Sequence, residues 1–146
     1  MPSRLHHVVV FVTDMDRSVH LFQDLLRLKL DWRIPRIGGR ELSELVGIPD
    51  MVAEMAYLRC PSGEVAVELI RLIHPQARPA GSGAAGNAGL SFVVQNLDHL
   101  HRLLTEEGWE PFTPSVRMRN PEGEWLRMFC FRIEEGLTIE LIQPEK

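Results

Sequence analysis

The sequence lacks features that several large classes of protein require. It has no run of Lys and Arg, and its formal net charge is −4. Binding to nucleic acid is therefore not expected, because neutralising phosphates needs clustered cations. No apolar stretch approaches the roughly 20 residues of a membrane-spanning helix, so no membrane association is expected. The N-terminal residues lack the apolar segment of a signal peptide. There are only two cysteines, which predicts reduced thiols and a cytoplasmic location.

The bulk composition is that of an ordinary globular protein. Hydrophobic residues make up 45% and charged residues 25% of the 146 positions. This length is enough for one domain with a hydrophobic core or for two small, co-dependent modules.

An internal repeat favours two small, co-dependent modules. Val8–Phe22 and Leu90–Leu104 superpose with an offset of 82, with hydrophobic and capping residues in the same order. Towards the end of each half, Glu68 in VELI and Glu140 in IELI differ by only 72. The first half therefore holds ten extra residues, and the Pro- and Gly-containing stretch Ile34–Asp50, with the helical-looking ELSELV inside it, can accommodate them.

Each half predicts the same order of elements, βαβββ. An apolar strand is followed by a polar helix cap, Asp14 or Asn96, and then by an amphipathic helix. The expected strands are Leu5–Val12, Leu28–Ile34, Met55–Cys60 and Val65–Ile73, then Leu90–Val94, Trp109–Thr113, Trp125–Ile133 and Leu137–Ile142. The predicted domains are a first module over residues 1–74, a flexible linker rich in Pro, Gly and Ala over 75–88, and a second module over 89–146.

Two carboxylates inside apolar strands mark the candidate site. A Glu in a buried strand is unfavourable unless its charge is compensated, and here it occurs twice at matching positions, Glu68 and Glu140. His7 alternates with Leu5, Val9 and Phe11 on a face expected to point inward. Imidazole and carboxylate ligands suit divalent Zn, Ni, Co, Mn or Fe. The alternatives are a hydrogen-bonded core histidine and glutamates on a solvent-facing side.

These motifs resemble the vicinal oxygen chelate superfamily, which includes glyoxalases, extradiol dioxygenases, methylmalonyl-CoA epimerases, and fosfomycin and bleomycin resistance proteins. The similar pieces are the opening HVVVFVTD and the closing VELI and GLTIELI, and the resemblance runs from His6 to Gln143. It implies an α+β fold of two tandem βαβββ modules that form a curved mixed sheet around a central cup. It also implies a small-molecule substrate or ligand and a homodimer.

The resemblance places metal ligands on the first and last strands of each module. By position, His7 matches the first ligand, Glu68 the second and Glu140 the fourth. The third should be a histidine seven residues before Asn96, and that position is Gly89. The three remaining ligands can still hold a divalent metal with positions open to water, and weak or absent binding is the alternative.

The expected function is a glyoxalase-like, metal-dependent lyase or isomerase/epimerase acting on a small substrate with two adjacent oxygens. Such a metal acts as a Lewis acid, and a glutamate moves a proton between neighbouring carbons. Glu140 is the first choice for the catalytic base, and Glu68 is equivalent by repeat symmetry. The alternative is a protein of the bleomycin-resistance type that sequesters a planar drug. A ring-cleaving dioxygenase is disfavoured because the second histidine is missing.

Four further residues are candidates for the substrate pocket. Arg127 alternates with aromatic residues that include Phe131, and its guanidinium suits an anionic oxygen. Trp32 and Tyr57 are candidates for the pocket wall. For all four, core packing or an outward face is the alternative reading.

Overall fold

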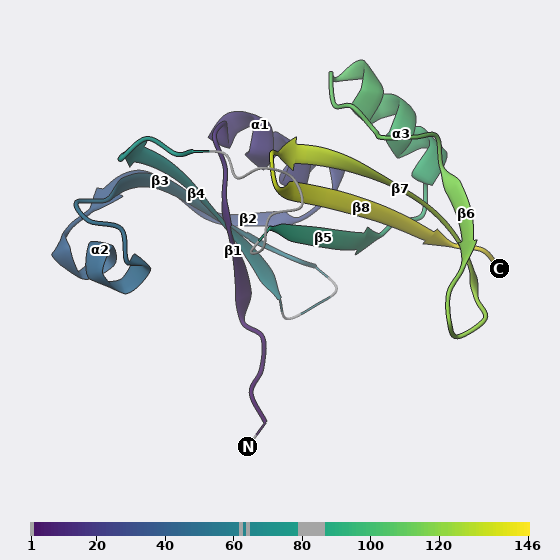
Figure 1. The fold of residues 1–146 in the computed structure, drawn as a ribbon, viewed down its shortest axis with the longest axis horizontal. Helices are drawn as coiled ribbons and strands as arrows, with labels where there is room; N and C mark the ends of the chain where they lie inside the picture. Colours follow the sequence, from purple (N-terminus) through teal and green to yellow (C-terminus); the bar gives the residue numbers. More distant parts are fainter. Residues whose placement is uncertain (1, 62, 64, 79–86) are drawn as a thin grey trace. The chain divides into compact units, whose positions relative to one another are not determined.

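The computed structural model describes residues 2–61, 63, 65–78 and 87–146. The chain divides into two compact units, residues 1–78 and 79–146 (Figure 1). Most of the predicted linker, residues 79–86, lies outside the described residues, as do Ser62 and Glu64.

Each unit is built on one four-stranded mixed sheet. The first sheet has the order β1-β4-β3-β2 and the second β5-β8-β7-β6, and the pairs β1/β4 and β5/β8 are parallel. The strands of the first unit are β1 (His7–Phe11), β2 (Lys29–Gly38), β3 (Val52–Arg59) and β4 (Ala66–His74). Those of the second are β5 (Ala88–Val93), β6 (Val116–Arg119), β7 (Trp125–Glu134) and β8 (Leu137–Pro144). The α+β fold of duplicated βαβββ modules is confirmed.

The helix of the first unit covers one face of its sheet. Asp14 caps α1 (Met15–Val19) by accepting a hydrogen bond from the backbone N–H of Arg17 at 3.0 Å, as predicted. The helix continues as a π-helical segment, His20–Leu25. Its apolar side chains, among them the fully buried Leu21 and Phe22, form the core with strand residues such as Val10, Leu58 and Leu69.

The predicted insertion stretch of the first unit, Ile34–Asp50, contains the helix α2 (Arg40–Val46). Leu42 and Val46 of this helix pack against a buried cluster that contains Met55 and Ile70. Met55 and Ile70 are paired across β3 and β4. Each lies next in sequence to a residue on the α1 side, Ala56 and Leu69, so alternation puts Met55 and Ile70 on the opposite face of the sheet. The insertion therefore covers one end of the face that α1 leaves uncovered.

The second unit differs from prediction at two places. The expected strand Trp109–Thr113 makes one isolated bridge, Pro111 to Phe131, and the edge strand forms later, at β6. Pro111 and Pro114 lack the N–H groups that a strand needs. Asn96 is the cap residue of α3 (Leu97–Glu106), but its side chain makes no capping hydrogen bond. The side chain of Gln143 on β8 instead accepts the Leu97 N–H at 2.8 Å.

Candidate functional site

The first unit brings His7 and Glu68 together. Val9 pairs with Glu68 in the parallel register of β1 and β4, so His7, Val9 and Glu68 share one sheet face. We call this face, opposite α1, the open face of the first unit. The His7 Nε2 and Glu68 Oε2 atoms are 3.9 Å apart. This separation is too long for a direct hydrogen bond and leaves room for a ligand in contact with both groups.

Glu68 is a partly buried carboxylate. Its side chain is 15% exposed, and that of His7 is 31% exposed. Among the described residues, no hydrogen-bond donor lies on the Glu68 carboxylate, and the imidazole of His7 is its polar neighbour. A carboxylate taken out of water in this way is stabilised by a cation or by a donor group.

Aromatic rings adjoin this pair on the open face. Tyr57 pairs with Glu68 across β3 and β4, and its ring lies 5.7 Å from that of His7. Trp32 pairs with Tyr57 across β2 and β3, and the two rings stack at 5.2 Å with 14° between their planes. Tyr57 is buried, whereas 37% of Trp32 is exposed. The structure thus places Tyr57 beside His7 and Glu68, and Trp32 one strand further away against Tyr57.

The second unit holds Glu140 in a different environment. Ser91 on β5 pairs with Glu140 on β8, and the Ser91 hydroxyl donates a hydrogen bond to Oε1 at 2.9 Å. Cys130 on β7 also pairs with Glu140, and its thiol lies 3.9 Å from Oε2. Burial, together with the nearby Glu140 carboxylate, raises the pKa of the Cys130 thiol. Glu140 is therefore held by two groups of its own unit, whereas Glu68 is not.

The strand registers of the two units are equivalent. His7 pairs with Ala66, two residues before Glu68, and Gly89 pairs with Thr138, two residues before Glu140. Gly89 thus occupies the position of His7 in the repeat, where it contributes no side-chain ligand. A Cβ atom added there would meet the Thr138 carbonyl oxygen at 3.6 Å, which is an ordinary contact.

Arg127 and Phe131 lie on the opposite face of the second sheet from Glu140. Cys130 faces Glu140, so by alternation these two residues point towards α3. Arg127 forms an ion pair with Asp98 of α3, and hydrogen bonding to Arg127 lowers the pKa of Asp98. Phe131 is fully buried and packs on Trp109 at 5.8 Å. Arg127 thus links α3 to the sheet, Phe131 belongs to the buried core, and neither shares a sheet face with Glu140.

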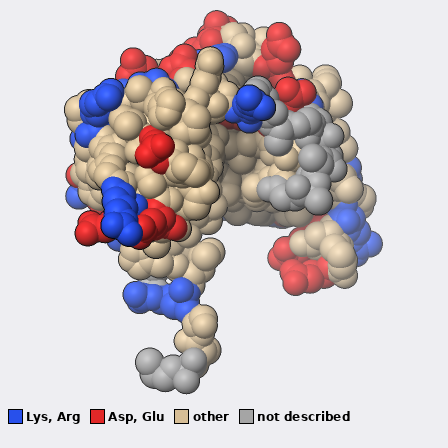
Figure 2. Space-filling model, turned by 60° about the vertical axis from the view of Figure 1, so that its left-hand side comes forward, with Lys and Arg blue, Asp and Glu red and all other residues tan. Residues whose placement is uncertain are grey.

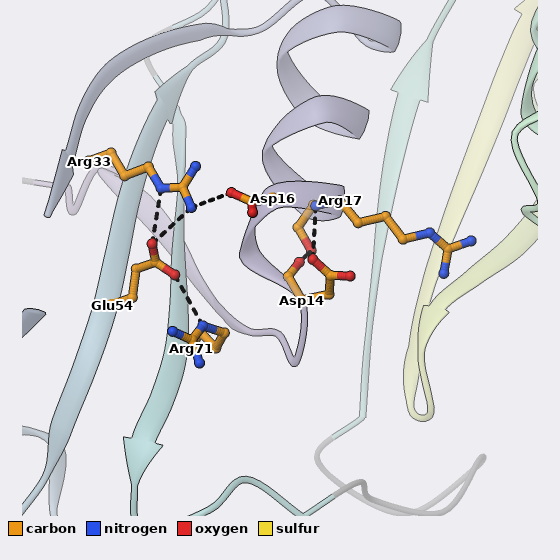
Figure 3. A network of polar contacts seen from close by, with 7 residues as sticks. Asp14, Asp16, Arg17, Arg33, Glu54 and Arg71 are labelled. Carbon is orange, nitrogen blue, oxygen red and sulfur yellow. Dashed lines mark hydrogen bonds and ion pairs between the residues drawn. The ribbon is translucent and has the colours of Figure 1, made fainter. Parts of the chain in front are cut away.

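An ionic network centred on the buried Glu54, on the α1 side of the first sheet, was not anticipated from the sequence. Glu54 on β3 accepts hydrogen bonds from Arg33 on β2, at 2.8 and 3.1 Å, and from Arg71 on β4, at 3.0 Å (Figure 3). Arg33 also donates to Asp16 of α1 at 2.6 Å. These hydrogen bonds to Asp16 and Glu54 raise the pKa of Arg33. The network ties α1 to three strands.

On the face shown in Figure 2, acidic and basic side chains are interspersed and separated by uncharged surface. Within residues 2–61, 63, 65–78 and 87–146, no three His, Cys, Asp or Glu side chains gather as a metal-binding group. In the same part of the chain, no helix is long and apolar enough to cross a membrane.

Comparison with known proteins identifies the class. The family model of the Glyoxalase/Bleomycin resistance protein/Dioxygenase superfamily matches residues 4–141, and the chain belongs to this superfamily. This confirms the resemblance seen in the sequence. No curated protein matches the chain.

Solved structures share the fold over the whole chain. A glyoxalase family protein from Bacillus cereus is 25% identical, with a TM-score of 0.84, over 100% of this chain and 97% of its own. A glyoxylase/bleomycin resistance protein/dioxygenase domain from Frankia sp. EAN1pec is 23% identical, with a TM-score of 0.67, over 99% and 100% of the two chains. TnmS3, an antibiotic binding protein from Streptomyces sp. CB03234, is 17% identical, with a TM-score of 0.60, over 99% and 98%.

Proposed function

We propose that the protein is a metal-dependent lyase or isomerase/epimerase acting on a small substrate with two adjacent oxygens. The observation that carries the proposal is the pair formed by His7 and Glu68. An imidazole and a partly buried carboxylate lie 3.9 Å apart on the open face of the first unit, with no donor on the carboxylate among the described residues. Superfamily membership supports the same chemistry.

The side-chain donor atoms of the candidate site are of the kinds that bind a divalent ion. His7 and Glu68 offer one nitrogen and one oxygen ligand, a combination that suits Zn, Ni, Co, Mn or Fe. Glu140 is the proposed third ligand, and Gly89 leaves the fourth position without a side chain. A site with so few protein ligands keeps positions for water and for substrate oxygens.

The proposed reaction moves a proton between neighbouring carbons. A bound divalent ion supplies Lewis acidity, which makes the C–H bond beside the two oxygens more acidic. Glu140 is the proposed base, taking the proton from one carbon and returning it to the next. Ser91 positions this carboxylate through its hydrogen bond to Oε1. Glu68 serves as a ligand and not as the base, because its neighbour is His7, whereas Glu140 accepts a hydrogen bond from Ser91.

The test is the metal content of the purified protein after exposure to each candidate ion and removal of the excess. We expect stoichiometric metal in the unaltered chain and its loss in His7→Ala, Glu68→Gln and Glu140→Ala. His20→Ala is a matched control, because this histidine pairs with Asp24 on an exposed helical surface. Metal retained by all the site variants, or absent from the unaltered protein, would contradict the proposal.

A second candidate is a binding protein that sequesters a planar drug without chemistry. Gly89 favours it, because a sequestering protein has no need of the third ligand, and the fold is shared with the antibiotic binding protein TnmS3. Metal-free protein that binds planar aromatic compounds equally well with and without His7→Ala would select this function.

Assembly and location are also proposed on the family resemblance. We propose a homodimer in the cytoplasm. Sedimentation equilibrium tests the first part, and a mass of about twice 16.7 kDa is the expected result. Cell fractionation tests the second.

A further inference from the structure

The two ring nitrogens of His7 have different neighbours. Nε2 lies 3.9 Å from Oε2 of Glu68, on the open face of the first unit. Nδ1 lies 2.8 Å from Nδ1 of His6, which is a hydrogen-bonding distance. Nε2 is therefore the nitrogen on the side of the proposed metal ligand Glu68, and Nδ1 is engaged by the preceding residue.

The bond between the two imidazoles determines where their protons are. A neutral imidazole carries one N–H and one unprotonated nitrogen, so one Nδ1 donates and the other accepts. If His6 donated, the proton of His7 would be on Nε2, and this atom would have no lone pair for a metal. If His7 donates, its Nε2 is unprotonated. In metal-binding histidines, the hydrogen bond made by one ring nitrogen sets the tautomer that frees the other.

The local structure holds both rings in this arrangement. His6 comes directly before β1, so strand alternation does not confine its side chain to the face opposite His7. Its carbonyl oxygen accepts from the Ala66 N–H at 3.3 Å, which ties its backbone to β4. Its ring meets that of His7 at 5.1 Å and 79°, and the Tyr57 ring lies 5.7 Å from that of His7. The His7 imidazole is thus oriented by two rings of the first unit.

The second unit lacks both members of this histidine pair. The repeat offset of 82 places Ala88 at the position of His6 and Gly89 at the position of His7. The candidate ligand and its hydrogen-bond partner therefore occur together in one unit and are both missing from the other. This is the pattern expected if His6 acts through His7.

We propose that His6 is a positioning residue of the metal site. Its Nδ1 accepts a hydrogen bond from the Nδ1–H of His7, which keeps Nε2 of His7 unprotonated and free to bind a metal. His6 itself does not touch the metal. The inference rests on the proposed metal-dependent function and adds to it a residue that sets the tautomer of the first ligand.

The first test reads the His7 tautomer in the metal-free full chain by nitrogen-15 nuclear magnetic resonance of the imidazole groups. The spectrum is recorded at a pH of about 8.5, above the range in which histidine side chains ordinarily titrate. The His7 signals are those that disappear in His7→Ala. We expect the proton on Nδ1 in the unaltered chain. His6→Phe keeps a ring but offers no acceptor, so it should shift the proton towards Nε2. His6→Asn has no ring but presents an amide oxygen, so it should retain the Nδ1–H tautomer.

The second test measures the affinity of the same variants for Zn²⁺ by isothermal titration calorimetry. His6→Phe should weaken binding by roughly tenfold, the lower end of the usual effect of removing such a partner, because the contact is exposed. His6→Asn should restore most of the loss. His99→Phe is the matched control, because this histidine is exposed on α3 and lies 3.3 Å from Arg102. Its affinity should equal that of the unaltered chain.

The outcomes separate the inference from the function on which it rests. A His7 tautomer or a Zn²⁺ affinity that is unchanged in His6→Phe overturns the inference. So does a His6→Asn variant that binds as weakly as His6→Phe, because His6 would then be a ligand itself or act by packing. The proposed function still stands in these cases if His7→Ala abolishes Zn²⁺ binding. An unaltered chain that binds no Zn²⁺ overturns the proposed function and the inference together.

Discussion

Replacing Glu54 by Gln tests whether the network in Figure 3 holds the first unit together. The Glu54 side chain is only 9% exposed and accepts three hydrogen bonds from two guanidinium groups. Removing one partner of a buried ion pair typically destabilises a protein by about 3–5 kcal/mol. The loss here is smaller, because Arg33 and Arg71 are 32% and 35% exposed and water can solvate them.

The expected magnitudes follow from this geometry. Glu54→Ala should lower the free energy of unfolding by about 2–3 kcal/mol, since it removes all three hydrogen bonds and the counter-charge of Arg71, and leaves Arg33 paired with Asp16 alone. Glu54→Gln should lower it by about 1–2 kcal/mol, because the amide oxygen still accepts from one guanidinium. With a urea dependence of about 1–3 kcal/mol per molar, the midpoint for Glu54→Ala should fall by roughly 1 M.

The assay is urea denaturation followed by far-ultraviolet circular dichroism. Glu44→Gln is the matched control, because its ion pair with Arg40 has side chains that are 64% and 89% exposed. Exposed pairs of this kind contribute less than about 0.5 kcal/mol. If Glu54→Gln and Glu44→Gln had the same midpoint, the reasoning that the buried network stabilises the unit would be refuted.

Three further predictions concern the candidate site and the cysteines. Gly89→His should raise the affinity for Zn²⁺, measured by calorimetry, by about tenfold or more, because it places an imidazole beside Glu140. Unchanged affinity would show that the equivalent strand positions of Gly89 and His7 have no functional meaning. Gly89→Ala should leave the thermal midpoint nearly unchanged, whereas Gly38→Ala should lower it clearly, because the new Cβ would lie 2.9 Å from a backbone carbonyl oxygen. Burial raises the pKa of the Cys60 thiol. In Cys130→Ser protein, alkylation of Cys60 by iodoacetamide should therefore reach half its maximal rate at a higher pH in the folded chain than in the urea-unfolded chain. Coincident pH profiles of the two states would contradict this.

The repeat, the order of strands and helices, and the family were all readable from the sequence. Their signals are local: the two-residue alternation of apolar strands, the cap at Asp14, and the glutamates at matching ends of the two halves. The inserted helix was also predictable, because ELSELV lies between Gly and Pro residues. The strand expected at Trp109–Thr113 is wrong: this segment makes one isolated bridge, because Pro111 and Pro114 lack the N–H groups that a strand ladder needs.

Alternation determines which residues share a face of a strand, but not which face a helix will cover. The sequence therefore grouped Arg127 and Phe131 together correctly, yet only the packing of α3 decided that they point away from Glu140. In the same way, the sequence identified His7, Glu68 and Glu140 as candidate residues. The distance of 3.9 Å between His7 and Glu68, and the hydroxyl of Ser91 on Glu140, depend on the register between strands that lie about 50 to 60 residues apart. Register is a property of the assembled sheet, so only the tertiary structure decided that one glutamate has donors from its own unit and the other has none among the described residues.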